Sequence, residues 1–233
     1  MVGSASVGQT NDIPNHKRDA FYVLPGPGVV VPTASTAYVA PDPIQPQSWR
    51  FKIPTSPQYT SKVTSAPLGS IGMMISAAVL FNPFEGDGTT VAMASNFSVT
   101  NAAGITARFI DQCAGHPVPG VGAYHYHGLP VCFAPQSTPS NIIGYALDGF
   151  PIYDPVDISG VRVPVAALDQ CNGINSPTPE FPNGIYHYIL PGTSDATSSI
   201  KCFHGVVNVS QIRAMPPMGW PAPDAAQRRP LNS

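Results

Sequence analysis

The chain has 233 residues, enough to bury a substantial hydrophobic core, and 43% of them are hydrophobic. Only 10% are charged and the formal net charge is −2, so composition gives no reason to expect nucleic acid or an anionic membrane as a partner. Because 28 prolines and 21 glycines are spread along a chain this hydrophobic, we predict a mainly β protein with loops set by Pro and Gly, rather than a disordered one.

The first part of the chain, residues 1–48, is rich in Pro, Ser and Thr and predicts an extended segment that adds little to the core. The N-terminus has no apolar stretch of the kind that a signal peptide contains. We expect a secreted or periplasmic protein from which the signal has been removed; the alternative is a cytosolic protein with free thiols. The longest apolar run, residues 71–81, is too short to span a bilayer.

Two stretches in the middle of the chain repeat each other. DQCAG at 111–115 is echoed by DQCNG at 169–173, and Tyr-His-Tyr follows each, at 124–126 and at 186–188. Repetition of the acid before each cysteine indicates a structural role for Asp111 and Asp169. A tandem duplication is the simplest explanation of the echo.

The echo continues upstream, where IGMMISAAVLFNP aligns without gaps with IGYALDGFPIYDP. We therefore predict a single compact domain over 49–210, followed by a Pro-rich tail at 211–233. Units of this size are marginally stable alone, so we expect them to share one core about a pseudo-twofold axis. The predicted units are about 69–133 and 141–204.

Secondary structure is expected to be short strands with few, short helices. The runs YHYH, IIGYALDGFPIYD and IYHYIL are aromatic or β-branched and bounded by Gly and Pro, which is typical of strands. Residues 104–113 and 164–171 each predict a short helix, the second beginning at Pro164.

Four cysteines favour two disulfides and an oxidising compartment. In each unit one cysteine precedes the Tyr-His-Tyr strand and one follows it. Among the three connectivities this favours Cys113–Cys132 and Cys171–Cys202. Zinc bound by four thiolates is a competing interpretation, weakened by the lack of any CxxC pair.

Histidines are concentrated around GAYHYHGLPVC at 122–132. Side chains alternate along a strand, so His125 and His127 face the same side and can bind one metal ion together. His187 is the repeat equivalent of His125, and His116 lies in the loop that a disulfide would hold near the strand. These four residues form the predicted metal site.

The two units differ at this predicted site, because His127 corresponds to Ile189 and His116 to Ile174. A single asymmetric site retained in one unit would explain the difference. Imidazole ligands suit copper or zinc more than magnesium or calcium, and we predict one ion. Zinc would support hydrolysis, and copper would support oxidation or simple carriage.

Other candidate residues have weaker grounds. His204 follows Cys202 and is a lesser candidate ligand, whereas His16 lies in a polar stretch and is expected to be solvated. Asp148 is the candidate catalytic residue, as a general base or as a partner of a metal-bound histidine, although Asp-Gly also marks a turn. No G-x-S-x-G, P-loop, G-x-G-x-x-G followed by an acid, or HExxH motif is present.

Tyr124 and Tyr126 face away from the two histidines. They would form either a platform for a small-molecule ligand or ordinary strand packing.

The motifs DQCAGH, GAYHYHGLPVC, IIGYALDGFPIYDP and LDQCNG together resemble the YHYH-domain family of bacterial and eukaryotic, often exported, proteins. WRFKIPTSP and PLGSIG resemble the opening segment of that family, so the likeness spans about 49–205. The resemblance implies no particular reaction, since the family is named for its motif. The first unit departs from it by lacking Gly-x-Pro-Ile-Tyr, and the second by ending YHYI.

Three hypotheses follow from the sequence. The first is a secreted metal-binding protein, which would include a metalloenzyme with oxidase or hydrolase chemistry. The second is a metal-free enzyme in which a histidine acts beside Asp148. The third is an extracellular binding or structural module. Convergent imidazoles would favour the first, a His–Asp contact in an open pocket the second, and dispersed histidines the third.

Overall fold

The computed structural model describes residues 4–18, 22–23, 39–40, 44–95, 98–100, 106–108, 110–118, 121–133 and 141–211. Except for Gln211, the predicted tail at 211–233 lies outside the described residues. The described secondary structure is mainly β, as predicted, and its helical segments are single 3-10 turns.

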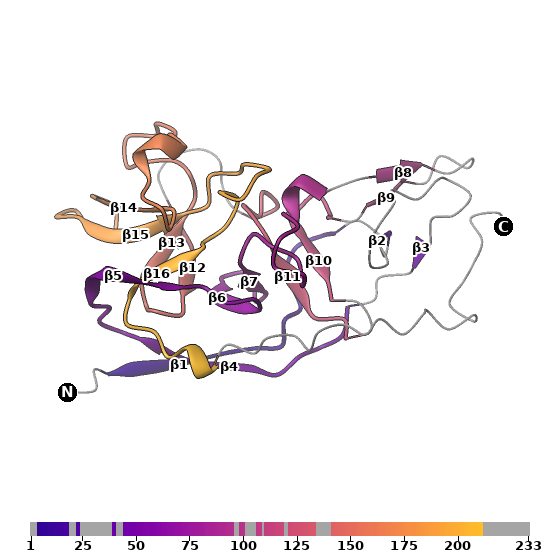
Figure 1. The fold of residues 1–233 in the computed structure, drawn as a ribbon, viewed down its shortest axis with the longest axis horizontal. Helices are drawn as coiled ribbons and strands as arrows, with labels where there is room; N and C mark the ends of the chain where they lie inside the picture. Colours follow the sequence, from indigo (N-terminus) through magenta and orange to yellow (C-terminus); the bar gives the residue numbers. More distant parts are fainter. Residues whose placement is uncertain are drawn as a thin grey trace.

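The largest sheet joins eight of the described strands in the order β10-β11-β7-β6-β12-β13-β15-β14 (Figure 1). The first predicted unit supplies β6 (Ser70–Met74), β7 (Val79–Phe81), β10 (Gly115–Pro117) and β11 (Tyr124–Tyr126). The second unit supplies β12 (Ile142–Ala146), β13 (Pro151–Tyr153), β14 (Gly173–Ser176) and β15 (Ile185–Ile189).

This sheet has the same strand order on both sides of its central β6–β12 pair. On each side an antiparallel hairpin, β6–β7 or β12–β13, is followed by a parallel partner, β11 or β15. An antiparallel edge strand, β10 or β14, then completes each half. The symmetry agrees with two units in one sheet; the tandem duplication itself stays a prediction from the sequence.

Three smaller sheets surround this one. β1 (Ala5–Thr10) pairs with β4 (Trp49–Pro54) along one side of the molecule, and β5 (Tyr59–Ser65) pairs with β16 (Cys202–Gly205) (Figure 1). A third sheet contains β2 (Tyr22–Val23), β3 (Val39–Ala40), β8 (Ser98–Thr100) and β9 (Thr106–Arg108).

The two predicted helices have different outcomes. Within 104–113 the described residues contain strand β9, so the helix predicted there is wrong. The β-branched Thr106 pairs opposite Thr100 in an antiparallel ladder, and this pairing outweighs local helix propensity. The second helix is confirmed as a 3-10 turn, Val165–Ala167, with Pro164 as its N-cap. The remaining 3-10 turns of the described residues are Met93–Ser95 and Val209–Gln211.

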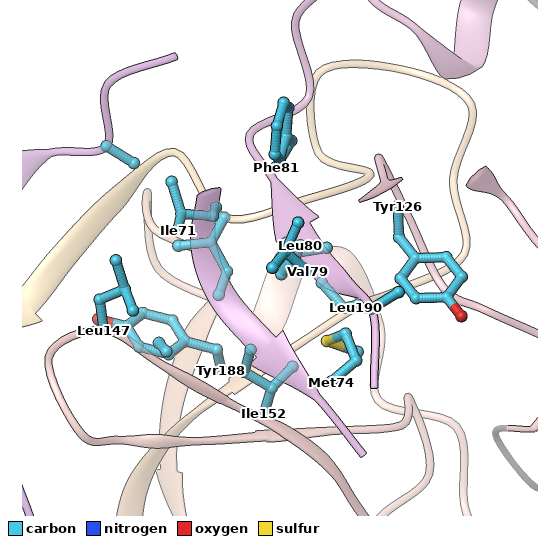
Figure 2. Close-up of a cluster of buried hydrophobic side chains, with 14 of the residues drawn as sticks. Ile71, Met74, Val79, Leu80, Phe81, Tyr126, Leu147, Ile152, Tyr188 and Leu190 are labelled. Atoms are coloured by element: carbon cyan, nitrogen blue, oxygen red, sulfur yellow. The ribbon is translucent and has the colours of Figure 1, made fainter. Parts of the chain in front are cut away.

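The hydrophobic core lies against the middle strands of the large sheet. Val79 and Leu80 of β7, Ile71 of β6 and Ile152 of β13 are fully buried. Figure 2 shows them packed with Leu147, Tyr188 and Leu190 from the second unit. Both units thus contribute to one core, because neither could bury its apolar face alone.

The N-terminal segment is docked on the first unit. Asp12 is completely buried, and its carboxylate accepts a hydrogen bond of 3.1 Å from the Val79 N–H. Burial raises the pKa of Asp12 to about 7. His16 is also packed: its Nε2 lies 2.5 Å from the Tyr126 hydroxyl and its ring stacks on Phe133. The expectation that His16 is solvated is therefore wrong, because its ring fills a space between aromatic side chains.

All four cysteines are described and paired, with disulfides Cys113–Cys132 and Cys171–Cys202, as favoured from the sequence. The competing interpretation of four zinc-bound thiolates is thereby excluded. Among the described residues, no helix has the length and apolarity that crossing a membrane would require.

Candidate metal centre

Three of the predicted ligands come together at the β10–β11 edge of the large sheet. His116 of β10 lies directly opposite His125 of β11 in the antiparallel register, with ring centroids 4.5 Å apart. His127 follows on the same face as His125, at 4.8 Å between centroids, and 5.2 Å from His116. All three side chains are buried. The cluster results from the H-x-H alternation along one strand and from one neighbour on the adjacent strand.

The loop before β10 is held by the DQC motif. One carboxylate oxygen of Asp111 accepts hydrogen bonds from the backbone N–H of Cys113 (2.8 Å) and Gly115 (3.2 Å). The other oxygen accepts one from the Tyr124 hydroxyl at 2.8 Å. Together with the Cys113–Cys132 disulfide, these bonds fix β10 against β11 and thereby set the position of His116. Asp111 therefore has the structural role that its repetition predicts.

Backbone carbonyls orient two of the imidazoles. Nδ1 of His127 lies 2.7 Å from the Asn82 carbonyl oxygen, and Nδ1 of His125 lies 3.2 Å from that of Ala123. Because a carbonyl oxygen only accepts, Nδ1 carries the proton in each neutral ring and Nε2 keeps a lone pair. This is the arrangement in which histidine binds a metal through Nε2.

Glu85 is a further member of the cluster that the sequence did not reveal. Its Oε1 lies 3.6 Å from Nε2 of His116 and 3.9 Å from Nε2 of His127, while its side chain is 22% exposed. Two sets of hydrogen bonds close the loop that carries Glu85. The Glu85 N–H donates to the Thr90 carbonyl oxygen at 2.8 Å, and the Asp87 carboxylate accepts from the N–H groups of Thr89 and Thr90. The signal available in sequence is that the gapless alignment, extended two residues beyond Pro83 and Pro155, pairs Glu85 with Asp157.

Burial controls the protonation of these groups. Desolvation lowers the pKa of His127 to about 4. Desolvation also lowers the pKa of His116 and of His125 well below the ordinary value, and neighbouring imidazoles add to these two shifts. Desolvation also raises the pKa of Glu85 to about 7, with a smaller contribution from Asp87. The imidazoles are therefore neutral at physiological pH, which is the form that binds metals.

The donor atoms fit a transition-metal ion. One nitrogen from each of His116, His125 and His127 lies within 4.8 Å of the others. Tetrahedral zinc with bonds of about 2.05 Å needs nitrogens roughly 3.3 Å apart. The imidazole nitrogens would therefore have to move by distances on the order of 1 Å to bind one ion together. Two other groups in the described residues have comparable spacing, but each depends on a disulfide-bonded cysteine rather than a thiolate.

His187, the fourth predicted ligand, lies elsewhere. β15 is separated from β11 in the sheet by β7, β6, β12 and β13, so the equivalent strands do not meet at the axis. Nδ1 of His187 bonds to the Ile185 carbonyl oxygen at 2.9 Å, and its ring packs edge-on to Tyr153. The prediction that His187 lies in the same site as the other three histidines is therefore wrong. His204 is also remote, with Nδ1 2.7 Å from the Thr60 carbonyl oxygen and Nε2 3.3 Å from Asp169.

Asp148 lies completely buried in the second unit. Its carboxylate accepts hydrogen bonds from the Tyr188 hydroxyl at 2.6 Å and from the N–H groups of Gly205 (2.9 Å) and Phe150 (3.2 Å). These partners account for a structural role that joins β15, β16 and the turn after β12. The catalytic role of Asp148 stays a prediction.

Tyr124 and Tyr126 are fully buried. The hydroxyl of Tyr124 bonds to Asp111, and that of Tyr126 bonds to Ser76 at 2.8 Å as well as to His16. Neither ring offers a face to a ligand from solvent, so of the two expectations strand packing describes them and the platform does not.

The site and its DQC frame coincide with the region that defines a protein family. The model of the YHYH protein family matches residues 50–161 and 156–205, which is well over half of the chain. The chain therefore belongs to the YHYH family, as its motifs indicated. Among curated proteins and among solved structures, no match was found.

Proposed function

We propose that this protein is a secreted metal-binding protein that holds one copper or zinc ion through His116, His125 and His127, with Glu85 as a fourth, carboxylate ligand. The observation that carries the proposal is the convergence of three buried, neutral imidazoles on one point. A purely structural cluster would be expected to satisfy each buried polar atom separately.

The polar atoms at this point support the proposal further. In the described part of the chain, neither Nε2 of His127 nor Oε1 of Glu85 has a hydrogen-bond partner, although both atoms are buried. Their separation of 3.9 Å is too long for a hydrogen bond. Leaving such atoms unsatisfied costs about 1–3 kcal/mol each, and a shared cation would remove that cost.

The kind of ion would decide the chemistry. Three imidazoles and a carboxylate suit zinc or copper. The disulfides agree with an oxidising compartment, where copper binding is more plausible than in the cytosol. Hydrolysis by zinc would require a water in a fifth position or in place of Glu85, and copper would supply oxidation or carriage. The partly exposed Glu85 is the one ligand through which the ion would meet solvent.

The test is metal analysis by mass spectrometry on protein purified without chelators, then loaded with copper or zinc and desalted. We expect about one ion per chain in the parent, and loss of most of it in His125→Ala and in His127→Ala. A parent that retains neither ion after loading would refute the proposal.

His187→Ala is the matched control for these variants. His187 has the same bond from Nδ1 to the carbonyl two residues before it as His125, but no imidazole opposite it. We expect His187→Ala to retain the full metal content. Equal loss in His187→Ala and His125→Ala would show that the metal binds nonspecifically or at another site.

A further inference from the structure

The DQC frame occurs a second time in the molecule. Asp169 accepts from the N–H groups of Cys171 (2.8 Å) and Gly173 (2.9 Å) and from the Tyr186 hydroxyl (2.9 Å). These bonds match those of Asp111 with Cys113, Gly115 and Tyr124. Each frame also has a histidine edge-on to its tyrosine, at 6.2 Å for His16 on Tyr124 and 5.2 Å for His204 on Tyr186. The two places can therefore be compared directly.

In the first frame the chain itself supplies a cation. The guanidinium carbon of Arg18 lies over the Tyr124 ring, 5.3 Å from its centroid. That distance is within the range of a cation–π interaction. Together with Asp12 and His16, Arg18 belongs to the N-terminal segment that covers this side of the first unit.

In the second frame the corresponding tyrosine borders a cavity. Tyr186 and the carboxylate of Asp169, whose side chain is 32% exposed, line an open cavity of about 600 Å³. Tyr59, itself 55% exposed, forms one wall, with its ring 5.0 Å from that of Tyr186 and stacked on His204 at 4.8 Å. The remaining lining residues are Pro57, Phe150, Ala167, Gly173, Ile174 and Asn175.

The charge around this cavity favours a cation. Among the residues that line the cavity, Asp169 is acidic and none is Lys or Arg. A carboxylate at the wall makes the local potential negative and attracts positively charged ligands.

We propose that the cavity between Tyr59, Tyr186 and Asp169 binds a guanidinium group, as free arginine or as an arginine side chain of a peptide. Arg18 over Tyr124 shows the occupant that the same frame accepts within this chain. The half-exposed Tyr59 ring provides a face for a planar cation, and the Asp169 carboxylate favours guanidinium over a neutral ligand of equal shape. The proposal is independent of the metal site, which lies at the opposite half of the sheet.

The test is a titration of isotope-labelled protein with Nα-acetyl-arginine amide, followed by amide chemical shifts. We expect saturable shifts around Tyr59 and at 173–175. Nα-acetyl-citrulline amide has nearly the same shape without the charge, and we expect it to bind at least about tenfold more weakly. Free arginine, titrated separately, distinguishes the two sources: equal affinity would identify the free amino acid as a sufficient ligand, and weaker binding would favour a peptide.

Variants of Tyr59 localise the binding. Because Tyr59 is more than half exposed, Tyr59→Leu should fold, and we expect its affinity for the arginine probe to fall about tenfold. Tyr59→Phe keeps the ring and should bind like the parent. Absence of saturable shifts in the parent, equal binding of the citrulline probe, or shifts confined to other regions would each overturn the proposal. Dispersed amide spectra like that of the parent, recorded on the same samples, verify that both variants are folded.

Discussion

His125 and His187 show how much a residue's neighbours decide. Both lie in a Tyr-His-Tyr strand, both are buried, and both bond through Nδ1 to the carbonyl two residues earlier. The residue opposite His125 is His116, whereas the residue opposite His187 is Ile174. This cross-strand difference, together with Ile189 at the position of His127, separates an imidazole in a cluster from one that packs against Tyr153.

The buried imidazoles predict a dependence of stability on pH. The pKa of His127 is about 4 in the native protein against an ordinary value of 6.5. Between these two pH values the unfolded chain binds a proton that the native state does not. The contribution of His127 to stability is therefore fully present above pH 6.5 and is lost as the pH falls towards 4. The difference between the two pKa values corresponds to about 3 kcal/mol. His116 and His125 act in the same direction, and Glu85, with its raised pKa, in the opposite one.

Urea unfolding of metal-free protein at about pH 7 and at about pH 4.5 measures this effect. We expect the loss of unfolding free energy between the two conditions to be about 2 kcal/mol smaller in His127→Gln than in the parent. Packing lost in the variant is the same at both pH values and cancels. An identical loss in parent and variant would contradict the assignment of a neutral His127.

At the scale of elements, the central β6–β12 pair decides how the two halves join. Gly144 lies opposite Met74 and Gly72 opposite Ala146, so a glycine stands on each strand where the two backbones meet. A Cβ at Gly144 would lie 2.7 Å from the Met73 carbonyl oxygen and 3.2 Å from Cα of Met74. Because backbone atoms cannot rotate away, the close pairing of these strands requires glycine here.

Gly144→Ala should therefore destabilise the protein, by about 1–3 kcal/mol, as measured by chemical denaturation. Gly86→Ala is the control, since a Cβ there would meet nothing within 4 Å and its backbone is not left-handed. We expect Gly86→Ala to change stability by less than about 0.5 kcal/mol. Comparable losses in the two variants would show that the β6–β12 contact does not limit stability.

For the whole molecule, the two disulfides lie at equivalent places but have different neighbours. Cys113–Cys132 spans 19 residues and encloses all three imidazoles of the candidate site, whereas Cys171–Cys202 spans 31 and encloses His187. Loop-closure entropy gives each a stabilisation of about 3–4 kcal/mol. The two disulfides thus stabilise the protein to a similar extent, but only Cys113–Cys132 encloses the candidate metal ligands.

Replacing each cysteine pair with serine separates these roles. We expect both double variants to lose comparable stability in thermal denaturation, about 3 kcal/mol. Zinc affinity, measured by competition with a chelating dye, should fall about tenfold or more in the Cys113/Cys132 variant, because the segment that positions His116 is released. The Cys171/Cys202 variant should keep parental affinity. Equal weakening in both would mean that the disulfides act only through global stability.

Features that depend on local pattern could be predicted from the sequence. Period-two alternation placed His125 and His127 on one face, Pro and Gly bounded the strands, and the repeated DQC motif correctly paired the cysteines. The same pattern identified His116 as a neighbour of the strand. These conclusions hold because adjacent residues in a strand, and residues joined by a short disulfide loop, have few alternative arrangements.

Contacts between residues far apart in the chain could not be predicted in this way. Sheet order separated His187 from the cluster by placing four strands between β11 and β15, and the loop at 84–91 brought in Glu85. The tertiary structure also docked His16 on Tyr126 and opened a cavity beside Tyr59 and Tyr186. Strand order and loop packing are selected by burial of the shared core as a whole, and no local pattern encodes that choice.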